Sequence, residues 1–205
     1  MPRSPRITYP GALYHITSRG NQQQRIFRRV ADRKHYLSLL VKYKKKFGFK
    51  LYTYALMPNH VHLMIMVSES EDATISKIMQ ALNTAYTVYF NKKYKQSGHL
   101  FQGRFHSKVV IKENYFWELS RYIHLNPVRA NLIKKPEKWR WGSYRIYLNP
   151  KLDFYKIIDR DELLAYQLQD GIVDPREQLK RYREFVEEAL KSKADVRFSK
   201  ILEKA

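Results

Sequence analysis

The chain has 205 residues, 44% of them hydrophobic, which suits one globular domain or one domain with a small appendage. It contains no cysteine, which excludes a disulfide scaffold, a thiolate zinc site, an iron–sulfur cluster and a cysteine nucleophile. The formal net charge is +20, and all of it falls in residues 1–147, which hold 27 Lys and Arg but only 7 Asp and Glu; residues 148–205 hold 12 basic and 12 acidic residues. A basic surface of this size favours a polyanionic partner, most simply nucleic acid, over a generic solubility charge.

The sequence also lacks the signals of membrane insertion and export. No hydrophobic run approaches the roughly 18 residues that a membrane span needs. The N-terminal segment Met1-Pro2-Arg3-Ser4-Pro5-Arg6 is not followed by the hydrophobic core of a signal peptide. We therefore expect a soluble, cytoplasmic protein with no membrane partner.

The first 111 residues are predicted to alternate between strands and helices. Hydrophobic residues recur every three or four positions in the helices, and the first strands are runs rich in β-forming residues. The predicted elements are a strand at 12–17, a polar loop at 18–25, a helix at 32–47, strands at 49–56 and 60–67, a helix at 75–90 and a strand at 105–111. Gly48 ends the first helix, and the Pro58-Asn59 turn joins the central strands into a hairpin. This order predicts an α+β, ferredoxin-like fold, with helices packed on an antiparallel sheet.

Residues 148–205 are expected to form a helical C-terminal extension of a core domain at 1–147. The extension holds a short predicted helix at 161–168 and a stronger one that Asp174 caps and Pro175 opens. Because it has no net charge, we do not expect it to be the main electrostatic platform for nucleic acid. It is expected to pack on the core, to pair with a second copy or to read DNA with few charges.

His60 and His62 flank Val61 at the start of the second central strand. Because side chains alternate between the faces of a strand, both imidazoles point to one side and Val61 points to the other, into a core. Two imidazoles on one face can form half of a metal site, although this pattern also occurs in purely structural strands. Met64 and Met66 share the histidine face, so we expect another part of the chain to cover it.

A second unusual stretch follows about sixty residues later, on a helix predicted to run from about 114 to 124 or slightly beyond. Tyr122 and Asn126 are four residues apart and share one helical face, with Glu118 one turn earlier, and Pro127 makes Asn126 the expected helix end. A phenolic oxygen can attack phosphorus once a metal polarises the phosphate. The third ligand is either the Asn126 carbonyl oxygen or the Glu118 carboxylate, and a mixed nitrogen–oxygen set fits Mg²⁺ or Mn²⁺.

The other five histidines are interpreted as structural, polar-contact or surface residues: His15, His35, His99, His106 and His124. His15 and His106 lie in strand-like runs beside basic residues. They are the two for which a role in the site stays open.

Several segments together resemble the single-tyrosine HUH transposases, most closely the branch of REP-associated tyrosine transposases. The segments are Leu13-Tyr14-His15-Ile16 with Ser18-Arg19-Gly20-Asn21, Met57-Pro58-Asn59-His60-Val61-His62-Leu63, Phe101-Gln102-Gly103-Arg104-Phe105-His106-Ser107 and Tyr122-Ile123-His124-Leu125-Asn126-Pro127-Val128-Arg129-Ala130. They follow the family's order over about residues 7–147. The second and the last segments are the most specific, whereas the C-terminal extension matches only loosely.

The resemblance implies an endonuclease that acts on single-stranded hairpin DNA with a short flanking tetranucleotide. His60 and His62 would bind a divalent metal, Mg²⁺ or Mn²⁺, and Asn126 occupies the position of the third ligand. Tyr122 would attack the scissile phosphorus, giving a 5′-phosphotyrosine and a free 3′-hydroxyl. A second 3′-hydroxyl could later attack that linkage and rejoin the DNA, so no ATP is needed.

The same resemblance suggests DNA contacts and bounds the assembly. The expected contacts are Arg19, Asn21, Arg104 and Arg129. Some relatives are homodimers that exchange the tyrosine helix between subunits, whereas the REP-associated branch acts as monomers, so either state is open here.

Two other functions compete with this one. The first is a non-cleaving module that binds structured DNA or RNA, domesticated from such a transposase, for which the basic core would suffice. The second is a metal phosphoesterase that uses water instead of Tyr122. The intact set of His60, His62 and Tyr122 favours the transposase-like endonuclease over both.

Overall fold

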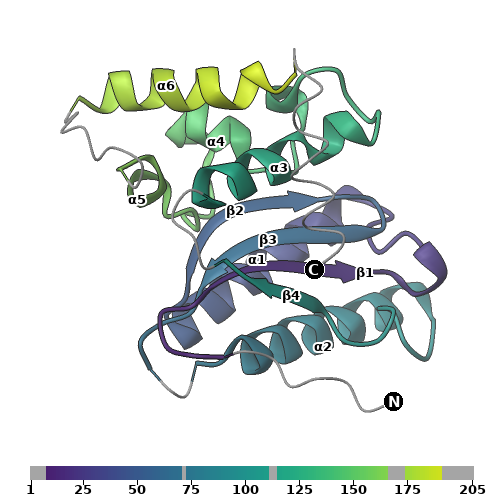
Figure 1. Ribbon diagram of the computed structural model, residues 1–205. Helices are drawn as coiled ribbons and strands as arrows, with labels where there is room; N and C mark the ends of the chain where they lie inside the picture. Colours follow the sequence, from purple (N-terminus) through teal and green to yellow (C-terminus); the bar gives the residue numbers. More distant parts are fainter. Residues whose placement is uncertain (1–7, 71–72, 111–114, 166–173, 191–205) are drawn as a thin grey trace.

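The computed structural model describes residues 8–70, 73–110, 115–165 and 174–190 (Figure 1). Met1 to Arg6 and the predicted element ends at 111, 114 and 166–168 lie outside these ranges. The elements, in chain order, are β1 (Leu13–Arg19), the 3₁₀ turn η1 (Asn21–Gln23), α1 (Val30–Phe47), β2 (Lys50–Leu56), β3 (His60–Met66), α2 (Ile75–Tyr94), β4 (His106–Val109), α3 (Tyr115–Arg129), η2 (Pro136–Lys138), α4 (Tyr144–Leu148), η3 (Pro150–Leu152), α5 (Arg160–Ala165) and α6 (Pro175–Glu188). Among the described residues, no helix is long and apolar enough to cross a membrane.

The four strands form one antiparallel sheet in the order β2-β3-β1-β4. This order, with a helix between β1 and β2 and another between β3 and β4, confirms the predicted α+β, ferredoxin-like fold. Strand β1 extends two residues into the predicted loop, because Ser18 pairs with Val61 and Arg19 pairs with His60. The longer strand brings Arg19 beside the first histidine of the pair.

One face of the sheet carries the larger hydrophobic core. Val61, Leu63 and Ile65 of β3 point to this face, as predicted, and are fully buried. They pack against residues of α1 and α2 such as Leu40 and Leu82. Both long helices therefore lie on this face (Figure 1). The histidines of β3 point to the other face, where Tyr122 of α3 lines the same cavity.

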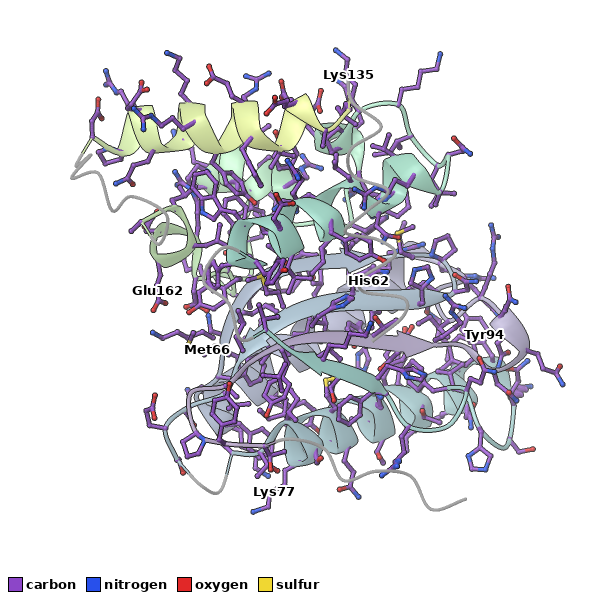
Figure 2. All side chains as sticks on the ribbon, viewed as in Figure 1. His62, Met66, Lys77, Tyr94, Lys135 and Glu162 are labelled. Atoms are coloured by element: carbon purple, nitrogen blue, oxygen red, sulfur yellow. The ribbon has the colours of Figure 1, made fainter. Side chains whose placement is uncertain are left out.

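Helix α3 covers the histidine face. Met64 of β3 is buried in a second cluster with Leu119 and Ile123 of α3. Figure 2 shows His62 and Met66 along the sheet below α3. The expectation that another part of the chain would cover this face is confirmed.

The prediction that this helix ends at Asn126 is wrong, because α3 continues through Pro127 to Arg129. Pro127 lacks the N–H that would have bonded to the Ile123 carbonyl, but the helix continues past it to Arg129. The amide of Ala130 donates to the Asn126 carbonyl oxygen at 2.9 Å. Asn126 therefore lies within regular helix, which fixes the direction of its side chain relative to Tyr122.

Residues 159–162 of the extension join the core at the end of the sheet remote from the histidine pair. The Asp159 carboxylate accepts hydrogen bonds from Lys44 Nζ at 2.6 Å and from the Leu51 amide at 2.7 Å. Glu162 of α5 pairs with Lys50 at 2.6 Å. Two acidic residues of the neutral extension thus hold basic residues of the core.

Helix α6 packs on the side of α3 that faces away from the sheet (Figure 1). The Tyr182 hydroxyl donates to Ser120 Oγ at 2.9 Å, and Tyr182 packs against the Trp117 ring at 5.1 Å between centroids. The Arg121 guanidinium lies 4.1 Å from the centre of the Phe185 ring and donates to the Phe185 carbonyl at 3.3 Å. Of the three expected roles for the extension, packing on the core is the one these contacts support. The division at residue 147 stays a prediction, since α4 spans it.

Candidate active site

A cavity of about 640 Å³ opens where β1, β3, α3 and the segment 101–108 meet. The predicted site residues that line it are Arg19, His60, His62, Arg104, Tyr122, Asn126 and Arg129. The fold therefore brings the histidine pair and Tyr122, about sixty residues apart in sequence, to one surface. Asn21 does not line this cavity. It lines a second, polar cavity that begins one residue beyond Gly20.

Each histidine of the pair has its Nδ1 atom held by another side chain. His60 Nδ1 lies 2.7 Å from Asn59 Oδ1, and Asn59 Nδ2 donates to the Gln23 carbonyl at 3.4 Å. Because that second bond orients the Asn59 amide, His60 must carry its proton on Nδ1. His62 Nδ1 lies 3.0 Å from His15 Nε2 and 3.4 Å from Thr17 Oγ1.

Burial keeps these imidazoles uncharged. Desolvation lowers the pKa of His60 to about 4, with a further lowering by the Arg19 charge. Desolvation also lowers the pKa of His15 to about 3 and holds the pKa of His62 well below its usual value. At neutral pH all three rings are neutral, so their unprotonated nitrogens are lone-pair donors.

Helix α3 presents Tyr122 and Asn126 to the histidines. The Tyr122 ring lies edge-on to both His15 and His62, with 5.7 Å between ring centres in each case. The Asn126 side chain hydrogen bonds to the His60 side chain. The Arg129 guanidinium lies 5.1 Å from the centre of the Tyr122 ring. One face of one helix thus supplies a phenol, a carboxamide and a cation to the cavity.

Glu118, the other residue considered as a third ligand, points elsewhere. Its carboxylate accepts a hydrogen bond from Arg121 Nη2 at 2.5 Å, and it does not line the cavity. Within the described residues, no group of three His, Cys, Asp or Glu side chains could hold a metal ion. A site built on His60 and His62 would therefore need another residue type, and the Asn126 carboxamide adjoins His60. Two neutral imidazoles and one amide oxygen are donors that suit a divalent cation with open positions.

The cavity is electropositive. Arg19, Arg104, Lys108 and Arg129 line it, and no Asp or Glu is among its described lining residues. Such a wall attracts anions and suits phosphate groups. Sequence reasoning did not select Lys108, although it lies two residues after His106 in the strand that pairs with β1.

Thr17 was also missed as part of this site, whereas His15, whose role had stayed open, lines it beside His62. They lie on β1, and Thr17 is the pairing partner of His62. Alternation along β1 could have placed both on one face, but the register between β1 and β3 was needed to bring that face to His62.

Comparison with known proteins identifies relatives of the chain. The profile of the family described as IS200-like transposases matches residues 8–126, more than half of the chain. A Haemophilus influenzae protein provisionally named as a REP-associated tyrosine transposase is 26% identical over 108 residues, which cover 48% of this chain. The chain spans about 60% of the length of that relative. A solved structure of a REP-associated tyrosine transposase bound to a REP hairpin shares the fold: the TM-score is 0.62 at 16% identity, covering 74% of this chain and 88% of the other.

Proposed function

The chain belongs to the IS200-like transposase family, and on that premise we propose that it is a metal-dependent, single-strand DNA endonuclease and strand transferase. The observation that carries the proposal is the convergence of Tyr122 and Asn126 with His60 and His62 on one cavity. A nucleophile beside a set of metal-ligand candidates suits phosphoryl transfer better than simple binding.

The proposed substrate is hairpin DNA with a single-stranded flank. Four cations and no described carboxylate line the cavity, which favours a phosphate backbone as ligand. The related structure that shares this fold has a REP hairpin bound. Phosphate contacts by Arg19, Arg104 and Arg129 would set the register of the strand over Tyr122. Asn21, in the neighbouring cavity, would contact the strand beyond the active site.

His60, His62 and Asn126 would hold a Mg²⁺ or Mn²⁺ ion. When bound, the ion supplies Lewis-acid polarisation of the scissile phosphate and neutralises its charge. His60 is held with its proton on Nδ1 by Asn59, so its Nε2 atom keeps a lone pair. Asn126 fits the third position because its side chain already contacts His60.

Tyr122 would carry out the covalent step. Its Oη atom attacks phosphorus, the bond from phosphorus to the 3′-oxygen breaks, and the phenolic proton balances the new 3′-hydroxyl. The product is a 5′-phosphotyrosine, and attack by another 3′-hydroxyl reverses the step and joins the strands. Arg129, whose guanidinium faces the Tyr122 ring, would offset negative charge on the phosphate.

A covalent-adduct assay tests the proposal. The protein is incubated with a labelled DNA hairpin and Mn²⁺, then denatured and separated by electrophoresis. We expect a labelled protein band that Tyr122→Phe abolishes. Tyr43→Phe is the matched control, because Tyr43 lies on α1, away from the cavity.

The outcomes separate the competing functions. An undiminished adduct in Tyr122→Phe would remove Tyr122 from its role. Cleavage that turns over without any adduct and survives Tyr122→Phe would indicate a phosphoesterase that uses water. Tight, salt-sensitive binding with no cleavage in Mg²⁺ or Mn²⁺ would indicate a binding module.

A further inference from the structure

His15 lies on β1, the strand that pairs with β3, and one of its ring nitrogens contacts His62. Its Nε2 atom lies 3.0 Å from His62 Nδ1, and the two ring planes are 7° from parallel with centres 5.3 Å apart. His15 is buried, with 7% of its surface exposed. The pairing of His15 with Met64 and of Thr17 with His62 fixes both strands around this contact.

The contact has a consequence for the far side of the His62 ring. A neutral imidazole carries one proton, on either Nδ1 or Nε2. If His62 donates from Nδ1 to His15, its Nε2 atom keeps a lone pair. If His15 donates instead, the proton of His62 lies on Nε2, and that nitrogen cannot bind a cation. His60 is already fixed in the first state by Asn59.

We propose that His15 is a positioning residue that accepts the Nδ1 proton of His62 and so holds the His62 Nε2 lone pair toward the cavity. The inference rests on the proposed function, because it gives His15 a part in metal binding. Ligating histidines commonly donate their second N–H to a fixed acceptor, and loss of that acceptor costs about 10–100-fold in metal affinity. Here the acceptor is a histidine, with Thr17 Oγ1 at 3.4 Å as a weaker second partner.

His15 is not itself assigned as a ligand. The nitrogen that faces His62 is used in the contact between the rings. In addition, His15, His60 and His62 are not arranged as a three-histidine metal group within the described structure. A purely structural role is the other alternative, and it predicts no change in the chemistry of His62.

Three variants separate these roles. His15→Phe keeps a ring of similar volume and removes the acceptor. His15→Gln keeps an acceptor, because a carboxamide oxygen has a reach similar to that of Nε2. His35→Phe is the matched control, since His35 stacks on Tyr89 between α1 and α2 and lines no part of the cavity.

The first measurement is the tautomer of His62 without metal, from long-range ¹H–¹⁵N correlation spectra of the full chain. We expect Nδ1–H in the wild type and in His15→Gln, and a shift toward Nε2–H in His15→Phe. A wild-type His62 protonated on Nε2, or a tautomer that does not change in His15→Phe, would overturn the inference. Should His15→Phe fail to fold, the wild-type and His15→Gln spectra still decide it.

The second measurement is the dissociation constant of Mn²⁺ by calorimetry. His15→Phe should weaken binding by about 10–100-fold, whereas His15→Gln should stay closer to the wild type and His35→Phe should match it. If His15→Gln loses as much affinity as His15→Phe, His15 is a ligand and the positioning role is wrong. If wild type and His15→Phe bind equally well, only this inference fails. If the wild type binds no Mn²⁺, the metal-dependent function fails with it.

Discussion

Helix α3 contacts two regions of the molecule on opposite sides, and these two regions differ in chemistry. The cavity side meets the core through Tyr122 and Asn126 and is surrounded by arginines and histidines. The opposite side meets α6 through Trp117 and Arg121, which contact the rings of Tyr182 and Phe185. The core carries the whole net positive charge of the protein, whereas the basic and acidic residues of the extension balance.

This difference suggests separate roles for the two regions: charge on the core and packing contacts on the extension. A nucleophile must be placed within fractions of an ångström of its phosphate, and displacement by 1 Å can cost about 10²-fold in rate. Under the proposed function, the core would supply the charge that attracts DNA, and the extension would supply contacts that fix the helix carrying Tyr122. The following predictions test this division, beginning with the largest expected effect.

Changes confined to the cavity should abolish chemistry and leave folding intact. His60→Ala removes a proposed ligand, and we expect covalent adduct with hairpin DNA to fall by at least about 10²-fold. The melting temperature should change little, because His60 is only half-buried and lies at the strand start. EDTA added to the wild type should have the same effect on cleavage, while hairpin binding persists. Cleavage that survives both treatments would show that the cavity does not use a metal.

Changes confined to the extension should act through stability. Tyr182 is fully buried between α6 and α3, so Tyr182→Ala should lower the free energy of unfolding by about 3–5 kcal/mol. Tyr182→Phe is the matched control: it loses only the hydrogen bond to Ser120, worth about 1 kcal/mol. Urea unfolding measures both. At a temperature where Tyr182→Ala is folded, cleavage should still be slower than in Tyr182→Phe. Equal rates would mean that α6 does not position α3.

Acid should destabilise both regions through buried histidines. Burial lowers the pKa of His124 to about 3, and both of its ring nitrogens lack a hydrogen-bond partner among the described residues. Between the unfolded pKa of about 6.5 and the folded value, only the unfolded chain binds the proton, so stability falls as pH drops through this range. Above pH 6.5 the histidine has no such effect. His15 and His60 act in the same direction from the cavity side.

His124→Phe isolates the contribution of His124, which lies on the side of α3 that faces α6, to the loss of stability in acid. The loss of unfolding free energy between pH 7 and pH 5 should shrink by about 2 kcal/mol in this variant. Stability at pH 7 should also rise by about 1 kcal/mol, because no unpaired ring nitrogens remain buried. Urea titrations at the two pH values measure both effects. If the unfolding free energy falls between pH 7 and pH 5 by the same amount in His124→Phe as in the wild type, His124 is solvated or has a partner in solution.

The smallest expected effect is on hairpin affinity, and it tests the difference in net charge between the core and the extension. Arg104→Ala removes a cation from the cavity wall, so hairpin affinity should fall several-fold and the slope of log K against log salt should decrease by about 0.9. Arg181→Ala is the matched control, because Arg181 lies on the exposed side of α6 in a pair with Glu177. Its affinity and slope should equal those of the wild type. If both variants lose affinity equally, the extension also binds DNA.

Much of the fold was predictable because it depends on local patterns. Alternation placed His60 and His62 on one side of a strand, and helical spacing placed Leu119 and Ile123 in the buried side of α3, where the structure has them. The family was predictable as well, because its residues cluster in short contiguous segments, and the match over residues 8–126 confirms it. The metal and the roles of individual site residues stay predictions.

The sequence by itself therefore determined the order of elements, the faces of individual strands and helices, and the two clusters that form the candidate site. Only the tertiary structure decided between Asn126 and Glu118 as the residue beside His60, because Asn126 contacts His60 while the Glu118 carboxylate pairs with Arg121. It also continued α3 through Pro127 and brought His15 against His62. These outcomes depend on strand register and on packing between distant segments, and periodicity within one segment carries no information about either.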